Sequence, residues 1–166
     1  MRVVDRSQMT RIAEKMRPVE VEKGQVVARK GDSCDVIWFV ASGSLRCEVD
    51  GIELQTLGAG QCIGEMSFIS VSMLVSSGTS LREARETALR TADVIPCERT
   101  ELLEISFDDA WAVVQKVPNL YYTLKEVAEM KKRNSERKIQ WAARDAALHD
   151  PAESRLGLLG AHSGKS

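Results

Sequence analysis

The chain has 166 residues, of which 43% are hydrophobic and 28% charged, and its formal net charge is −1. That length suits one soluble domain with a single core. The small net charge gives no global electrostatic basis for binding nucleic acid or a membrane, so any anion site must be local.

The cysteines are too widely spaced for a CxxC metal or redox pair. They are Cys34, Cys47, Cys62 and Cys97. Only His149 and His162 could add imidazole ligands, and both lie near the far end of the chain. We therefore expect no metal site. Reduced thiols fit a cytoplasmic protein better than a disulfide framework does.

The first ten residues lack the apolar core of a signal peptide. No run of about 20 apolar residues follows, so no transmembrane segment is expected. The first element is a helix over about Val4 to Met16, where apolar residues recur at spacings of three and four. Arg17-Pro18 ends it, because proline disfavours helix in the residue before it.

Short strands separated by glycine turns follow, over residues 19–106. Strand-like runs occur at 19–22, 25–27 and 36–40. The clearest alternation places Leu45, Cys47 and Val49 on one side of a strand. Asp50-Gly51 then predicts a tight hairpin. Because no helix alternates with these strands, an antiparallel β-roll is favoured over a parallel α/β sheet.

The pattern is less clear from Ser67 to Leu89. Met73, Leu74 and Val75 are apolar, residues 76–80 resemble a flexible tip, and residues 81–89 favour a short charged helix. Strand character returns at 92–95 and 102–105.

The remainder is helical. Ser106 with Asp109 resembles a capping box for one helix. Pro118 ends that helix, and Asn119 can cap the next, from Leu120 to about Leu148. The expected divisions are an N-terminal helix (1–18), the β-roll (19–106), the C-terminal helices (107–149) and a loose tail (150–166). The predicted fold class is α+β, mainly β: a jelly-roll-like antiparallel β-roll with a short N-terminal helix and two C-terminal helices.

Three features carry a resemblance to a known family. They are the glycine series Gly24, Gly31-Asp32, Gly43, Gly51, Gly58 and Gly60, the run Ile63–Ile69, and the run Arg90–Val94. Together they resemble the cyclic-nucleotide-binding domain family, which includes the catabolite activator protein, the protein kinase A regulatory subunit and cyclic-nucleotide-gated channels. The resemblance covers about Val4 to Met130.

The resemblance implies a binding cassette for cAMP or cGMP, and no other cofactor. Its ligand-binding residues would be Ile63, Gly64, Glu65, Met66, Ser67, Arg90, Thr91 and Ala92. Arg90 can hold a phosphate through two charge-assisted hydrogen bonds, helped by the amides of Met66 and Ser67 at a helix start. Glu65 would accept the ribose 2′-hydroxyl, and Gly64 would let the backbone approach the sugar. The Thr91 hydroxyl can bond a guanine amino group, yet the choice between cAMP and cGMP stays open.

The last helix would act as a lid that carries the signal. Leu124, Val127 and Met130 share one face and are the possible lid residues. The basic run Lys131-Lys132-Arg133 with Arg137-Lys138 is read as a solvated helix face, with contact to a partner domain or an acidic surface as the alternative.

The match to the family has an insertion at about 70–89, inside the cassette. It can be a surface excursion, since long loops cost little extra entropy to close, or it can reshape or fill the pocket. Arg82 and Arg85 lie in it and could replace Arg90.

We therefore expect a regulatory sensor domain in signal transduction, with a cyclic nucleotide and a protein partner or further domains as its partners. The alternative is a scaffold or interaction protein that uses a degenerate form of the fold without nucleotide. No arrangement of catalytic residues indicates an enzyme. The chain after Met130 is too short for a helix-turn-helix, so nucleic acid is not an expected partner.

Overall fold

The computed structural model describes residues 6–148. Within them, four strands form an antiparallel sheet in the order β1-β7-β2-β5. These strands are β1 (Arg17–Val21), β2 (Val36–Ser42), β5 (Cys62–Ile63) and β7 (Thr100–Ser106). The apolar run predicted at 36–40 lies in β2, which pairs with a neighbour on each side. A position inside the sheet suits β-branched and aromatic side chains.

Three further strands form a second antiparallel sheet in the order β4-β3-β6. They are β3 (Leu45–Val49), β4 (Ile52–Leu57) and β6 (Asp93–Pro96). Asp50 and Gly51 join β3 to β4 with φ angles of 51° and 78°. These left-handed values are the ones a tight primed turn requires, so the predicted hairpin is confirmed.

Both sheets contribute to one buried core, which closes the roll. Its members come from β1 to β7 and the loop before β2: Val21, Ala28, Trp38, Val40, Leu45, Cys47, Leu57, Ile63, Val94 and Leu102. The segment 25–27, expected as a strand, is not one. It is held beside β6 by a bridge from Ala28 to Val94 and by the Val27 amide, which donates to the Val94 carbonyl at 2.9 Å.

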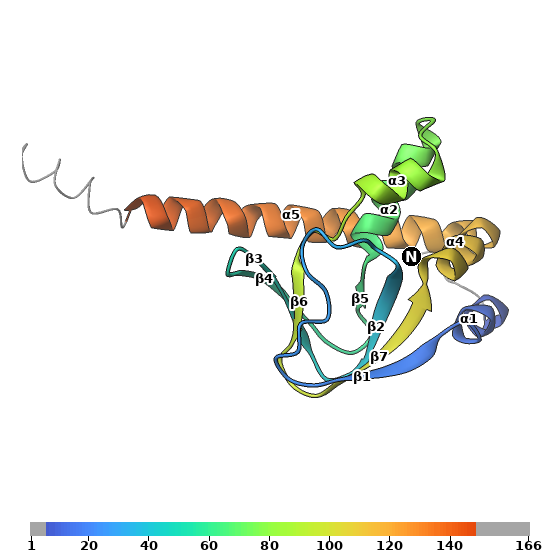
Figure 1. The fold of residues 1–166 in the computed structure, drawn as a ribbon, viewed down its shortest axis with the longest axis horizontal. Helices are drawn as coiled ribbons and strands as arrows, with labels where there is room; N and C mark the ends of the chain where they lie inside the picture. Colours follow the sequence, from blue (N-terminus) through green and yellow to red (C-terminus); the bar gives the residue numbers. More distant parts are fainter. Residues whose placement is uncertain (1–5, 149–166) are drawn as a thin grey trace, which may run out of the picture.

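Three helices flank the roll: α1 (Arg6–Ala13), α4 (Phe107–Lys116) and α5 (Pro118–Leu148). Ser106 caps α4 by accepting a hydrogen bond from the Asp109 amide at 3.1 Å, as predicted. The prediction that Asn119 caps the last helix was wrong. Pro118 is already its first residue, a position that suits proline because an amide proton there would have no acceptor within the helix. Figure 1 shows α5 crossing the roll and continuing beyond it. The fold class is thereby confirmed.

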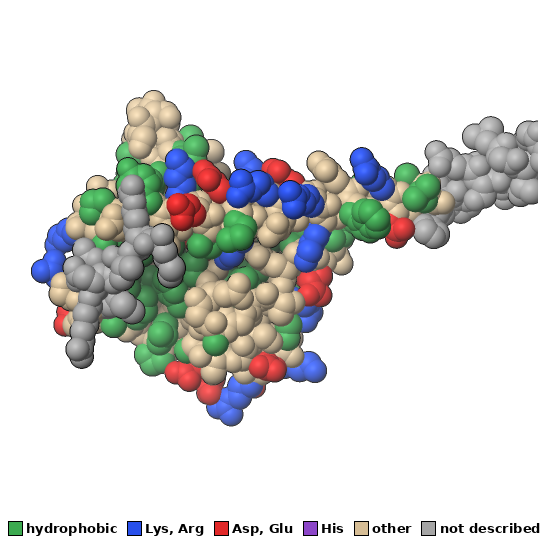
Figure 2. All heavy atoms as spheres, turned by 180° about the vertical axis from the view of Figure 1, so that it is seen from behind, with side chains coloured by type: hydrophobic (Ala, Val, Ile, Leu, Met, Phe, Trp, Pro, Cys, Tyr) green, Lys and Arg blue, Asp and Glu red, His purple; other side chains and the backbone are tan. Residues whose placement is uncertain are grey.

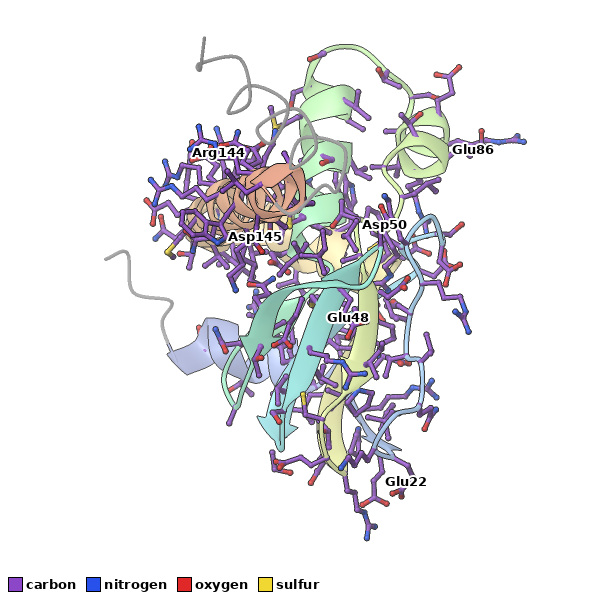
Figure 3. The ribbon with its side chains drawn as sticks, turned by 90° about the vertical axis from the view of Figure 1, so that its left-hand side faces the viewer. Glu22, Glu48, Asp50, Glu86, Arg144 and Asp145 are labelled. Atoms are coloured by element: carbon purple, nitrogen blue, oxygen red, sulfur yellow. The ribbon has the colours of Figure 1, made fainter. Side chains whose placement is uncertain are left out.

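The insertion folds with the end of the cassette as a helical hairpin of α2 (Glu65–Ser76), whose later part lies in the insertion, and α3 (Leu81–Thr87). Ser80 and Glu83 form a capping box at the start of α3. Figure 3 shows Glu86 of α3 on the opposite side of the view from Arg144 on α5. The sequence predicted α3 but missed α2. Apolar residues are distributed around all sides of α2, so its sequence shows no amphipathic period. This distribution suits its packing, because α2 contacts both α3 and α5.

None of the helices within residues 6–148 is both long and apolar enough to cross a membrane. Two predicted features lie outside the described residues: the loose tail at 150–166 and the beginning of the first helix at Val4 and Asp5.

Candidate functional site

A cavity of about 240 Å³ lies between the second sheet, the start of α2 and the middle of α5. All the residues that the sequence proposed for ligand binding line it: Ile63, Gly64, Glu65, Met66, Ser67, Arg90, Thr91 and Ala92. No residue from 70 to 89 is among the lining residues. The fold thus brings the two halves of the expected cassette to one place.

The hairpin insertion closes on itself at its base. The Ser67 hydroxyl donates to the Leu89 carbonyl at 3.0 Å, which joins the start of α2 to the residue before Arg90. The Arg90 amide in turn donates to the Asp32 carbonyl at 2.8 Å, within the Gly31-Asp32 turn. Of the two interpretations of the insertion, this geometry fits the surface excursion.

Arg90 is a buried cation, with 6% of its surface exposed. Its Nη2 donates to the Val36 carbonyl at 2.8 Å, and the guanidinium lies 4.4 Å from the centroid of the Trp38 ring. Its Nη1 is buried and has no hydrogen-bond partner, the one such side-chain atom found within residues 6–148. A buried donor without an acceptor is costly, so the group is suited to an anion that enters the cavity.

Trp38 is itself held in place. Its Nε1 donates to the Glu104 carboxylate at 2.8 Å, and Arg17 donates to the other oxygen of the same carboxylate. Burial alone would raise the pKa of Glu104, but the hydrogen bonds from Trp38 and Arg17 outweigh it and leave that pKa below its ordinary value. An ionised Glu104 therefore fixes the ring against which Arg90 lies.

Gly64 is required by the approach of Arg90. Its φ of 100° is left-handed, and a Cβ there would lie 3.1 Å from Arg90 Nη1 and 3.2 Å from the Val36 carbonyl oxygen. α2 begins at the next residue, and its first helical hydrogen bond runs from the Phe68 amide to the Gly64 carbonyl. The amides before Phe68 have no helical acceptor, which makes this end of α2 favourable for an anion.

Glu65 is almost completely enclosed, with 1% of its surface exposed. Lys131 of α5 forms an ion pair with Glu65 Oε1. Lys131 Nζ also donates to the Cys62 carbonyl, and the Cys62 thiol donates to Glu65 Oε2 at 3.5 Å. Burial, reinforced by the Glu65 carboxylate, raises the pKa of the Cys62 thiol, which keeps that thiol protonated as a donor.

Sequence reasoning missed Lys131, which it assigned to a solvated basic face. The other members of the run are exposed: Lys132, Arg133, Arg137 and Lys138. Figure 2 shows Lys and Arg side chains gathered along α5. A usable signal existed, since Lys131 follows Leu124 and Ala128 at helical spacing on the buried face of α5.

The three residues proposed for the lid do not line the cavity. Leu124 is buried in the apolar core shared with α2 and α4, Val127 is partly buried, and Met130 is 52% exposed. α5 packs on α2 first and reaches the cavity about one to two turns later. Its lining residues are Lys131, Lys132, Ser135, Glu136 and Ile139.

The two arginines considered as substitutes for Arg90 lie elsewhere. Arg85 pairs with Asp108 at 3.1 Å and with Asp35 at 3.5 Å. Arg82 pairs with Glu86 along α3 at 3.2 Å. Neither lines the cavity, so Arg90 is the arginine available to a ligand there.

The arrangement suits a small molecule that carries one anionic group and one hydroxyl group. Arg90 and the start of α2 can bind the anionic group. Glu65 can accept a hydrogen bond from the hydroxyl group of the same ligand. Among residues 6–148, no three side chains of metal-ligating type are grouped to hold a metal ion.

Comparisons with known proteins bear on the family and the fold. A family model described as "Cyclic nucleotide-binding domain" matches residues 18–117. The fold is similar to the c-di-GMP responsive global regulator CLP of Xanthomonas campestris, with a TM-score of 0.62 and 20% identity over 97% of this chain and 73% of that one. It is also similar to the catabolite activator protein of Thermus thermophilus, with a TM-score of 0.61 and 21% identity over 84% of this chain and 61% of that one.

A third similar structure is the regulatory domain of Toxoplasma gondii PKA with cAMP, with a TM-score of 0.52 and 23% identity over 66% of this chain and 38% of that one. At these identities the likeness concerns the fold. The chain spans less than two thirds of the length of the Thermus and Toxoplasma proteins.

Proposed function

This chain belongs to the cyclic nucleotide-binding domain family, and from that premise we propose that it is a regulatory module that binds a 3′,5′-cyclic mononucleotide. The ligand lies in the cavity bordered by α2, β6 and α5, and its binding is communicated through α5. The observation that carries the proposal is Arg90, a buried cation that lines the cavity and whose Nη1 has no acceptor.

The phosphate is assigned to Arg90. A cyclic phosphate carries one negative charge, and a guanidinium can meet it with charge-assisted hydrogen bonds. Because Trp38 and the Val36 carbonyl already fix the guanidinium, little side-chain entropy is lost on binding. The amides of Met66 and Ser67 add donors at the start of α2.

The ribose is assigned to Glu65. Its carboxylate lies on the cavity wall next to Gly64 and accepts from the 2′-hydroxyl. A ligand that lacks this hydroxyl leaves part of the carboxylate buried without a donor, which costs affinity. The base lies toward Thr91 and the lining residues of α5, such as Ser135 and Ile139.

The choice of nucleotide is a matter for titration. Thr91 lines the cavity, and its hydroxyl can bond the amino group of guanine, which favours cGMP by one hydrogen bond of about 0.5–1.5 kcal/mol. The Xanthomonas regulator is described as responsive to c-di-GMP, so c-di-GMP is the third ligand to test.

The experiment is a melting and calorimetric titration of the purified chain with cAMP, cGMP and c-di-GMP. At a hundredfold excess over Kd, a ligand that binds only the folded state adds about 2.7 kcal/mol. For a chain of this size the melting temperature then rises by about 5–10 °C. Absence of a shift with millimolar cAMP and cGMP contradicts the proposal.

Two controls sharpen the assignment of the ligand groups. Arg90→Gln should abolish the shift, while Arg82→Gln, which removes an exposed arginine paired along α3, should leave it intact. The ligand 2′-deoxy-cAMP should bind more weakly than cAMP if Glu65 accepts the ribose hydroxyl. Equal loss in both arginine variants would point to non-specific anion binding.

A further inference from the structure

Lys131 occupies an unusual place for a lysine on a surface helix. Its side chain is 9% exposed, and that of its partner Glu65 is 2% exposed. Within the described residues, Arg90 is the one other basic side chain that is buried. Burying an ion pair costs the hydration of both groups, so it persists only where additional hydrogen bonds compensate. The Cys62 carbonyl provides such a bond to Lys131 Nζ.

The contacts of Lys131 join three elements. The lysine belongs to α5, Glu65 is the first residue of α2, and Cys62 is the first residue of β5. One ammonium group thus fastens the long C-terminal helix to the floor of the cavity.

The same ammonium occupies the carboxylate that a ribose needs. Glu65 Oε1 is taken by Lys131 and Oε2 by the Cys62 thiol. Lys131 also lines the cavity, whose volume of about 240 Å³ lies below the range of roughly 300–1,000 Å³ usual for ligand pockets. Withdrawal of Lys131 would free the carboxylate and enlarge the cavity in one movement.

We propose that Lys131 is a latch: it holds α5 against the cavity in the free protein, and the ligand hydroxyl displaces it from Glu65. This inference rests on the proposed function. The exchange leaves Glu65 with a hydroxyl donor and returns the ammonium to water. α5 loses its tether at that moment, so the occupancy of the cavity determines the position of the helix. A ligand shifts such an equilibrium only by its differential affinity for the two positions.

The test compares wild type, Lys131→Met and the control Lys138→Met, an exposed lysine of α5 outside the cavity lining. Each is titrated with cAMP and cGMP. A latch opposes binding, so Lys131→Met should bind more tightly, by a factor within the range of about 5–150 typical of coupling between sites. Hydrogen exchange of α5 beyond residue 131 should be faster in the free variant. Lys138→Met should match wild type in both measurements.

The other results have definite meanings. Weaker or unchanged binding by Lys131→Met, with wild type binding normally, overturns the latch and leaves the proposed function intact. Binding by neither wild type nor Lys131→Met overturns the proposed function itself. Binding by Lys131→Met alone supports a latch that is closed too firmly in wild type.

A second pair of variants covers the case in which Lys131→Met does not fold. Glu65→Gln removes the ion pair while keeping an acceptor, and Glu65→Gln/Lys131→Met also removes the lysine. The latch predicts nearly equal affinities for these two proteins, because the ion pair between Lys131 and residue 65 is already absent from both. A weaker affinity of the double variant would show that Lys131 contacts the ligand directly, and would overturn the latch.

Discussion

The cavity has a buried charged side chain on each side, and the two differ in whether their polar atoms already have hydrogen-bond partners. Arg90 and Glu65 are both charged, both almost wholly buried and both among the lining residues. The arginine is fixed by neutral neighbours, a tryptophan ring and a carbonyl, and keeps Nη1 without a partner. The glutamate has a donor on each oxygen.

This difference separates recognition from response. A donor that is already oriented and has no acceptor gains a hydrogen bond when an anion binds beside it, which favours affinity. A carboxylate whose two oxygens already have donors gains less from a further donor, so a ligand hydroxyl competes with the existing contacts. Because the ion pair with Lys131 comes from α5, in the proposed complex the Glu65 side of the cavity (the sugar side) can report binding to the helix, whereas the Arg90 side (the phosphate side) only retains the ligand.

The largest effect, on the free energy of unfolding, is expected when the ion pair between Glu65 and Lys131 is broken. Lys131→Met leaves Glu65 charged, buried and without its cation, and should lower the free energy of unfolding by about 3–5 kcal/mol. Glu65→Gln/Lys131→Met removes both charges and should recover much of that loss. Urea denaturation of the two variants checks the difference. A cost for Lys131→Met no greater than that of the exposed control Lys138→Met, about 0.5 kcal/mol, would mean that the pair contributes little.

An intermediate effect is expected on the phosphate side from Gly64→Ala. Gly78 provides a matched control, because both glycines have a φ of 100°, yet a Cβ on Gly78 meets nothing within 4 Å. Both alanine variants should lose about 1–2 kcal/mol of stability through the left-handed backbone. In Gly64→Ala alone, the new methyl group displaces Arg90 Nη1 from its position.

Calorimetric titration with cAMP and cGMP separates these two glycine variants. Loss of charge-assisted hydrogen bonds of about 1.5–3 kcal/mol should weaken ligand binding by Gly64→Ala roughly 10–150-fold. Gly78→Ala should bind as wild type does. Equal affinities in the two variants would show that the position of Arg90 does not limit binding.

The fold was accessible from the sequence because its signals are local. Alternation along residues 45–49, the Asp50-Gly51 turn and the Ser106 cap each depend on a few neighbouring residues. α2 was not accessible in this way. Most of it packs against α3 and α5, and its exposed side carries the apolar Met73, so its sequence shows neither the helical period nor the strand period on which prediction depends.

The site likewise has a part that local sequence signals predict and a part that depends on tertiary packing. Gly64, Glu65 and Arg90 follow from a motif in the sequence, and their convergence on one cavity needed only the ends of the insertion to meet. The contribution of α5 was placed too early, at Leu124, Val127 and Met130. The register of a long helix against the roll depends on tertiary packing, and no local pattern in a helix of 31 residues specifies it.

The smallest expected effect is on the pH dependence of stability. It can be measured with two buried thiols, Cys34 near Arg90 and Cys62 near Glu65. Cys34 and Cys62 are similarly enclosed, at 5% and 7% exposure. Burial raises the pKa of both thiols. At Cys34 the Arg90 guanidinium opposes the rise, whereas at Cys62 the Glu65 carboxylate adds to it. The folded pKa of each thiol lies above its unfolded value near 9.0, so the unfolded chain releases these protons first as the pH rises.

The stabilisation is therefore complete below pH 9 and is lost above it, by at most about 1.4 kcal/mol per pH unit for each thiol. The free energy of unfolding, measured by urea denaturation at pH 8, 9 and 10, should fall over the last interval. Cys62→Ala should reduce this fall more than Cys34→Ala does, because the anion beside Cys62 holds its proton longer. The reverse order would mean that the positive charge of Lys131 outweighs the negative charge of Glu65 at the Cys62 thiol. The field around Cys62 would then resemble the field that Arg90 produces at Cys34.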